Sequence, residues 1–68
     1  MTAVGARFAG GPVVVGVGTF LDVPMVDLEL PGSVTVPLFP DEARRLAVVL
    51  IEHAAKVERK AARRAATA

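Results

Sequence analysis

The fold is decided within residues 34–50, VTVPLFPDEARRLAVVL, where the spacing of the apolar residues changes. Val34, Val36 and Leu38 recur at every second position, which is the period of a strand. From Pro40 onwards the apolar residues recur at the three- and four-residue spacing of an amphipathic helix. The stretch therefore predicts a strand that leads directly into a helix.

The helix start carries suitable residues for an N-terminus. Proline suits the first helical position, and Asp41 and Glu42 follow in the first turn, where the helix dipole favours acids. Phe39 occupies the position where serine or threonine usually caps, but Glu42 can reach back to the backbone N–H of Phe39, as in a capping box. We expect a helix from Asp41 to about Arg64, roughly 36 Å long.

Two further strands precede this one. Residues 12–20 are rich in β-branched side chains, and apolar residues alternate with acidic ones over residues 26–30. A four-residue loop at residues 21–24 would place Val17 opposite Leu28 and bring the apolar side chains of both strands to one face.

The next hairpin turns at residues 31–33, Pro-Gly-Ser. A three-residue loop would place Leu30 opposite Val34, whereas a two-residue Pro-Gly turn would place Leu30 opposite Ser33. We expect the three-residue loop, because it keeps the apolar side chains on one face. The predicted fold is α+β: a three-stranded antiparallel β-meander followed by one long C-terminal helix. This β-β-β-α domain would occupy residues 12–68, with residues 1–11 as a flexible arm.

Composition narrows the classes of function. The 68 residues are 53% hydrophobic and 22% charged and include no cysteine, which excludes a disulfide scaffold and a thiolate zinc site. His53 is the only histidine and has no partners for a metal site, and no nucleophile–base pair can be named. We therefore expect a protein that is not an enzyme and needs no cofactor.

The longest run without charge, residues 8–21, is broken by glycine and proline and is shorter than the roughly 20 apolar residues of a membrane-spanning helix. We expect no membrane partner and a cytoplasmic location.

A domain of this size buries only about 60% of the surface of its unfolded chain, so self-association is the expected means of stabilisation. The strand at residues 12–20 has no charge and no proline after Pro12, so its edge is open to a second copy. We expect a homodimer with these contact residues: Val14, Gly16, Gly18 and Ala54.

A second surface is expected to bind another protein. The helix is longer than the strands. Its first half should lie across the sheet face that contains Val15, Val17 and Leu28, and its second half should overhang the sheet. An apolar cluster should lie on the outer sheet face. The predicted partner-binding residues are Phe20, Met25, Phe39, Val57 and Ala61.

Nucleic-acid binding is the alternative. Residues 1–40 carry one arginine against three acids, a net charge of −2, whereas residues 41–68 carry seven basic residues against four acids, a net charge of +3. Clustered positive charge suffices for sequence-independent phosphate binding, although no aromatic residue is interleaved for base stacking. The residues of this alternative are Lys56, Arg59, Lys60, Arg63 and Arg64.

The segment from Val34 to Ala47, continuing to Leu50, resembles a segment of small actinobacterial and actinophage proteins in which a strand leads into a Pro-Asp-Glu-Ala-Arg helix start. It covers about a quarter of the chain, and Phe39 departs from the capping hydroxyl that is usual there. The resemblance implies a phage or high-GC bacterial setting, in which small proteins often act by binding a host protein. We therefore expect a host or cellular protein as the partner.

Overall fold

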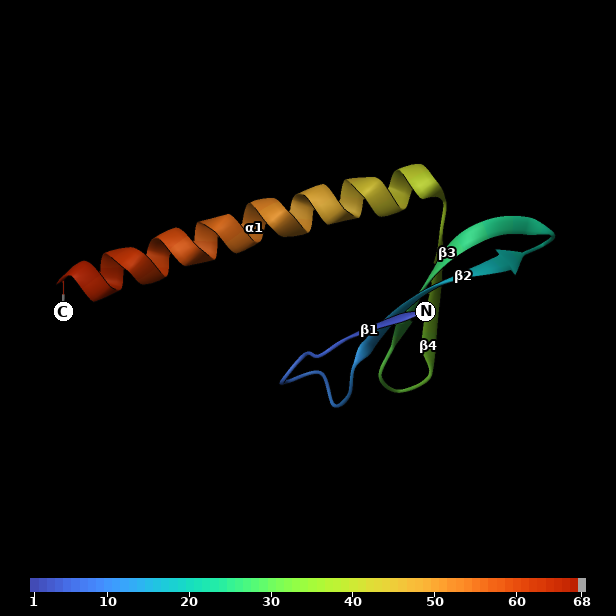
Figure 1. The fold of residues 1–68 in the computed structure, drawn as a ribbon, viewed down its shortest axis with the longest axis horizontal. Helices are drawn as coiled ribbons and strands as arrows, with labels where there is room; N and C mark the ends of the chain where they lie inside the picture. The colour runs from blue at the N-terminus through green and yellow to red at the C-terminus, as the bar shows by residue number, and fades with distance from the viewer. Residues whose placement is uncertain (68) are drawn as a thin grey trace.

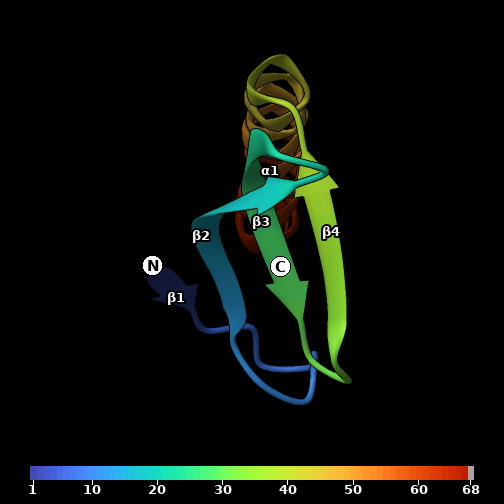
Figure 2. The same ribbon diagram turned by 90° about the vertical axis from the view of Figure 1, so that its right-hand side faces the viewer.

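The computed structural model describes residues 1–67, which form an antiparallel sheet followed by one helix (Figure 1). Seen from the side, the strands lie in the order β1-β2-β3-β4 (Figure 2). The α+β class and the single C-terminal helix are confirmed. The elements are β1 (Thr2–Val4), β2 (Val13–Phe20), β3 (Val23–Leu30), β4 (Val34–Leu38) and α1 (Pro40–Thr67).

The sheet has four strands, so the expectation of three was wrong. Thr2–Val4 lies within the segment that was expected to be an arm, and it pairs antiparallel with β2, with Thr2 opposite Val15 and Val4 opposite Val13. A strand of three residues is too short to show a two-residue period in the sequence. The same pairing covers part of the β2 edge that was expected to be open.

The hairpin between β2 and β3 is tighter than expected. Leu21 and Asp22 form its turn, with φ values of 51° and 65°, and Phe20 pairs with Val23. Positive φ at both central residues is the signature of a type I′ turn, which matches the twist of a hairpin. Val17 therefore pairs with Val26 and not with Leu28. The predicted register was wrong by two residues, an even shift that leaves every side chain on its predicted face.

The hairpin between β3 and β4 has the predicted three-residue loop, with Leu30 opposite Val34. Gly32 has a φ of 90°, a conformation that glycine adopts without steric cost. Ser33 follows with a φ of 64°, in the left-handed position that glycine more often takes.

The helix start also agrees with the sequence analysis. The Phe39 backbone N–H donates to Oε1 of Glu42 at 2.8 Å, and the Ala43 N–H donates to the Phe39 carbonyl at 2.9 Å. Half of a capping box thus stabilises the junction between β4 and α1.

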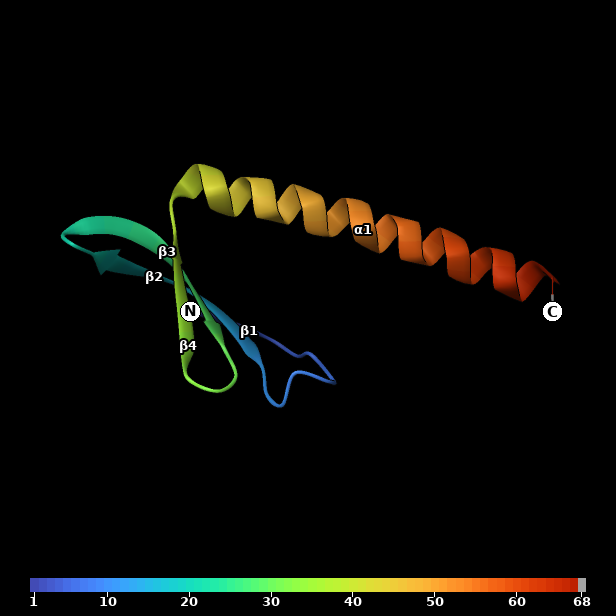
Figure 3. The same ribbon diagram turned by 180° about the vertical axis from the view of Figure 1, so that it is seen from behind.

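The helix touches the sheet only through its first turns and then runs away from it (Figures 1 and 3). With 28 residues, α1 is about 42 Å long, so most of it overhangs, as the lengths of the elements predicted. The molecule measures 54 × 26 × 15 Å, and its radius of gyration is 15.5 Å, against about 11 Å for a compact chain of this length.

The chain accordingly exposes much surface. Its accessible area is 5783 Å², whereas a compact monomer of 7.1 kDa exposes about 4,100 Å². Met25, at 6% exposure, is the only buried hydrophobic side chain among the described residues. A single copy therefore lacks an extended hydrophobic core.

Candidate functional site

An apolar cleft lies at the end of the sheet where the β2–β3 turn meets the start of α1. We call it the end cleft, and its volume is about 310 Å³. Six of its seven lining residues are apolar. The seventh is Glu42, whose carboxylate already accepts the hydrogen bond from the Phe39 N–H. The end cleft is lined by Phe20, Leu21, Val23, Met25, Pro37, Phe39 and Glu42.

Strand pairing explains how the end cleft forms. The two-residue turn places Phe20 directly opposite Val23, and Met25 lies opposite Gly18, which has no side chain to cover it on that face. Pro37 follows on the neighbouring strand, opposite Asp27. The lining of the cleft therefore offers mainly apolar surface.

Three of the predicted partner-binding residues meet in this cleft. Phe20 and Phe39 are 53% and 50% exposed, while Met25, which also lines the cleft, is buried. The other two predicted residues, Val57 and Ala61, do not line it and lie on the overhanging part of α1. Leu21 and Val23 were missed, because both fell within the longer predicted loop, whereas in the structure Leu21 lies in the tight turn and Val23 begins β3.

A second apolar depression separates the sheet from the first turns of α1. We call it the helix groove, and its volume is about 200 Å³. The sheet contributes alternate residues of β2, β3 and β4, and the helix contributes residues at three- and four-residue spacing. The helix groove is lined by Val15, Val26, Leu28, Leu38, Ala43, Leu46, Ala47 and Leu50.

The helix does not close this groove in a single copy. The predicted faces are those that line it, but Leu50 remains 61% exposed and Val17, expected beneath the helix, is 89% exposed. The first half of the helix therefore covers the sheet only in part, less than expected. The reason is geometric: α1 leaves the sheet beyond its first turns (Figure 1), and Leu50 and Val57 are 61% and 64% exposed.

The four predicted dimer residues do not form one surface. Val14, Gly16 and Gly18 lie on the sheet face opposite the helix groove, since they alternate with Val15, whereas Ala54 lies on α1. Val14 is moreover paired with Ala3 of β1, so the open edge expected at this point of β2 is occupied.

Gly18 has a local role. A side chain at this position would collide with the carboxylate of Asp27, whereas a side chain at Gly16 would meet no atom within 4 Å. The absence of a side chain at Gly18 thus leaves room for Asp27.

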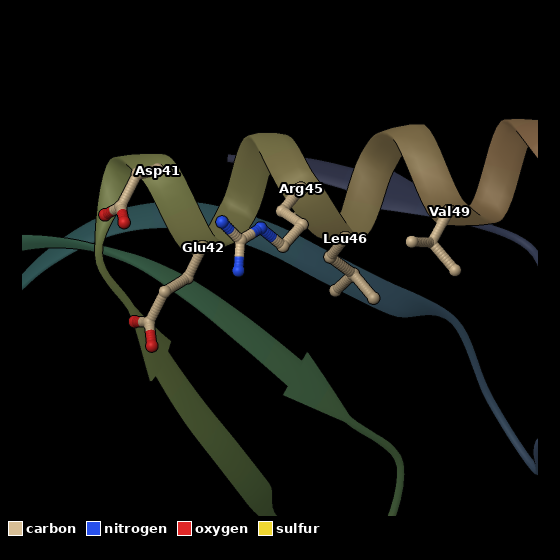
Figure 4. Close-up of a pocket in the computed structure, with 5 residues that line it drawn as sticks. All are labelled: Asp41, Glu42, Arg45, Leu46 and Val49. Atoms are coloured by element: carbon tan, nitrogen blue, oxygen red, sulfur yellow. The ribbon is translucent and has the colours of Figure 1, made fainter.

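The first turns of α1 carry charged side chains beside a shallow surface depression (Figure 4). Asp41 and Glu42 are consecutive residues of the first turn, and the Glu42 carboxylate accepts the hydrogen bond from the Phe39 N–H. His53 donates its Nδ1–H to the Val49 carbonyl at 2.8 Å, within its own helix. In residues 1–67 no group of histidine and acidic side chains could hold a metal ion.

The part of α1 beyond Leu50, which we call the overhang, bears the basic residues of the nucleic-acid alternative. All five lie in exposed positions on one helix, and Val57, at 64% exposure, lies among them. The overhang thus combines apolar and cationic surface. The basic residues are Lys56, Arg59, Lys60, Arg63 and Arg64.

Within residues 1–67, no helix has the length and hydropathy needed to cross a membrane. Comparisons with protein-family models, with curated proteins and with solved structures find no match for this chain.

Proposed function

We propose that this chain is a non-enzymatic protein-interaction module that works as a homodimer. One observation carries the proposal: the single chain exposes about 1,700 Å² more surface than a compact monomer of its mass. Covering that excess on two copies would bury about 3,400 Å², within the 2,000–5,000 Å² of obligate homodimers.

The character of the exposed surface supports the same proposal. Leu50, Ile51 and Val57 are 61%, 69% and 64% exposed along one helix. Burying such a side chain from full exposure is worth about 1.5–3 kcal/mol, so covering the exposed part of each is worth about 1–2 kcal/mol. A second copy is always present at the same concentration as the first, and a twofold axis lets one apolar patch cover another.

Size-exclusion chromatography with light scattering tests the homodimer. We expect a mass twice the 7.1 kDa of one chain at micromolar concentration. A mass of 7.1 kDa at high micromolar concentration would refute the proposal.

We propose further that the end cleft binds a second protein. The cleft has the apolar lining and partly exposed aromatic rings typical of protein contacts. The setting implied by the resemblance, a phage or high-GC bacterium, suggests a host protein as the partner.

Site-specific photo-crosslinking tests the end cleft. A photoreactive phenylalanine analogue at position 20 should crosslink to one discrete protein in a host lysate. The matched control is the same analogue at Phe8, which is fully exposed and lies outside the cleft. Equal labelling from both positions would count against the end cleft.

Nucleic-acid binding remains the alternative, supported by the five basic residues of the overhang. Its test is a duplex DNA probe titrated across a salt series. A phosphate-driven complex loses affinity steeply with salt, whereas an apolar protein contact barely responds. The proposed protein-binding function predicts that neutralising the five basic residues leaves partner binding intact, and loss of partner binding would favour the alternative.

A further inference from the structure

We propose that the helix groove of each copy holds the overhanging half of α1 from a second copy, with the two helices antiparallel. This inference rests on the proposed homodimer and specifies its geometry. The groove and the overhang are then complementary parts of one interface that occurs twice around a twofold axis.

The first support is the continuity of the apolar stripe along α1. Ala43, Ala47 and Leu50 line the groove, and the same three- and four-residue spacing continues through the overhang. This is the period of a seam between two helices, and small residues allow close approach. The continuing residues are Ala54, Val57 and Ala61.

The second support is the match of side-chain sizes in one antiparallel register. Leu50 would face the second copy's Ala54, and Ala47 would face its Val57. Each larger side chain thus meets a smaller one, the alternation that fills an interface without voids. The same register places Ala43 opposite the second copy's Ala61.

The third support is the distribution of charge beside this stripe. In the same register Arg44 lies next to the second copy's Glu58, and the twofold axis repeats this pair of opposite charges. Within one chain these residues are separated by 14 positions, about 21 Å along the helix, and cannot pair.

A parallel pair of helices would cover less of the exposed apolar surface than an antiparallel pair. It would bring both sheets to the same end, where each sheet already faces the apolar side of its own α1. The second copy's sheet and helix would then compete for one groove. An antiparallel pair places each overhang beneath the other copy's sheet, and the exposed Val17 and Leu50 become covered.

Disulfide trapping tests this geometry, because the natural chain contains no cysteine. Chains carrying Ala47→Cys and chains carrying Val57→Cys are mixed, oxidised in a glutathione buffer and analysed on non-reducing gels. We expect a crosslinked heterodimer, since the antiparallel register brings positions 47 and 57 within the Cα separation of a disulfide.

The single variants provide the control for direction. Two Val57→Cys chains should not crosslink to each other, since their sulfurs lie about 15 Å apart along the antiparallel pair. Ala62→Cys, mixed with Ala43→Cys, is the control for face, because position 61 would face position 43 and position 62 is turned about 100° around the helix from position 61.

The outcomes separate this inference from the proposed function. A dimer by light scattering in which Val57→Cys crosslinks to itself, or in which positions 47 and 57 do not crosslink, overturns the antiparallel geometry and leaves the homodimer standing. A monomer by light scattering overturns both.

A charge reversal supplies a second test that does not depend on oxidation. Arg44→Glu and Glu58→Arg should each weaken self-association roughly three- to thirtyfold, because two rim ion pairs per dimer are lost. The double variant should restore it. Failure of the double variant to recover would overturn the proposed register.

Discussion

Truncating Leu50 to alanine measures whether the helix groove is covered. In a single copy Leu50 is 61% exposed. The substitution removes three carbon atoms, each worth about 0.8 kcal/mol when fully buried, so a monomer at this exposure would lose about 1 kcal/mol. A leucine enclosed by a second copy would instead show the 2–5 kcal/mol typical of a core position. An open groove and a groove covered by a second copy therefore predict different losses of unfolding free energy for Leu50→Ala.

The assay is urea unfolding followed by circular dichroism at two protein concentrations. We expect Leu50→Ala to lower the free energy of unfolding by about 2–5 kcal/mol per chain and to lower the concentration dependence of the midpoint. Val48→Ala is the matched control, because Val48 is 53% exposed on the same helix but does not line the groove. Similar costs of about 1 kcal/mol or less for both variants would refute the reasoning.

Three further predictions concern the single chain. Glu42→Ala should lower stability by about 0.5–2 kcal/mol in thermal unfolding, while Glu42→Gln, which keeps an acceptor for the capping hydrogen bond, should cost less; equal losses would argue against the cap. Replacing Leu21 and Asp22 by Asn-Gly should raise stability by about 1–2 kcal/mol, because these residues suit positive φ, and a decrease would contradict the turn. Gly16→Ala should be more stable than Gly18→Ala in urea, because only the latter displaces the Asp27 carboxylate; the reverse order would contradict the strand pairing.

Two parts of the fold could be predicted from the sequence. The Pro-Asp-Glu start predicted the hydrogen bond between Phe39 and Glu42, because a few neighbouring residues determine the backbone there. The pairing of Leu30 with Val34 followed from the alternation of apolar residues, which allows only registers that keep them on one face.

Two elements were missed because their signals are weak. A turn with leucine at positive φ has no strong signature, since side-chain sterics disfavour that conformation in all residues but glycine. β1 depends on pairing with β2, a contact that its own three residues do not encode. The register between β2 and β3 was therefore wrong, and the edge of β2, expected to be open, is occupied at Val13–Val15.

The candidate site was predicted in part. Phe20, Met25 and Phe39 meet in the end cleft. The error in register was two residues, so Phe20 and Met25 still lie on the sheet face that was predicted for them. The helix groove was not foreseen. Periodicity identified the face of α1 that points towards the sheet, but it carries no information on the angle between helix and sheet. That angle leaves Leu50 exposed in one copy.

Small-angle X-ray scattering over a dilution series tests the central claim most directly, because one curve reports both mass and radius of gyration. If a second copy covers the apolar surface, the mass will be twice 7.1 kDa at micromolar concentration and will fall only on strong dilution. A particle of 7.1 kDa with a radius of gyration near 15.5 Å throughout the series would contradict that claim.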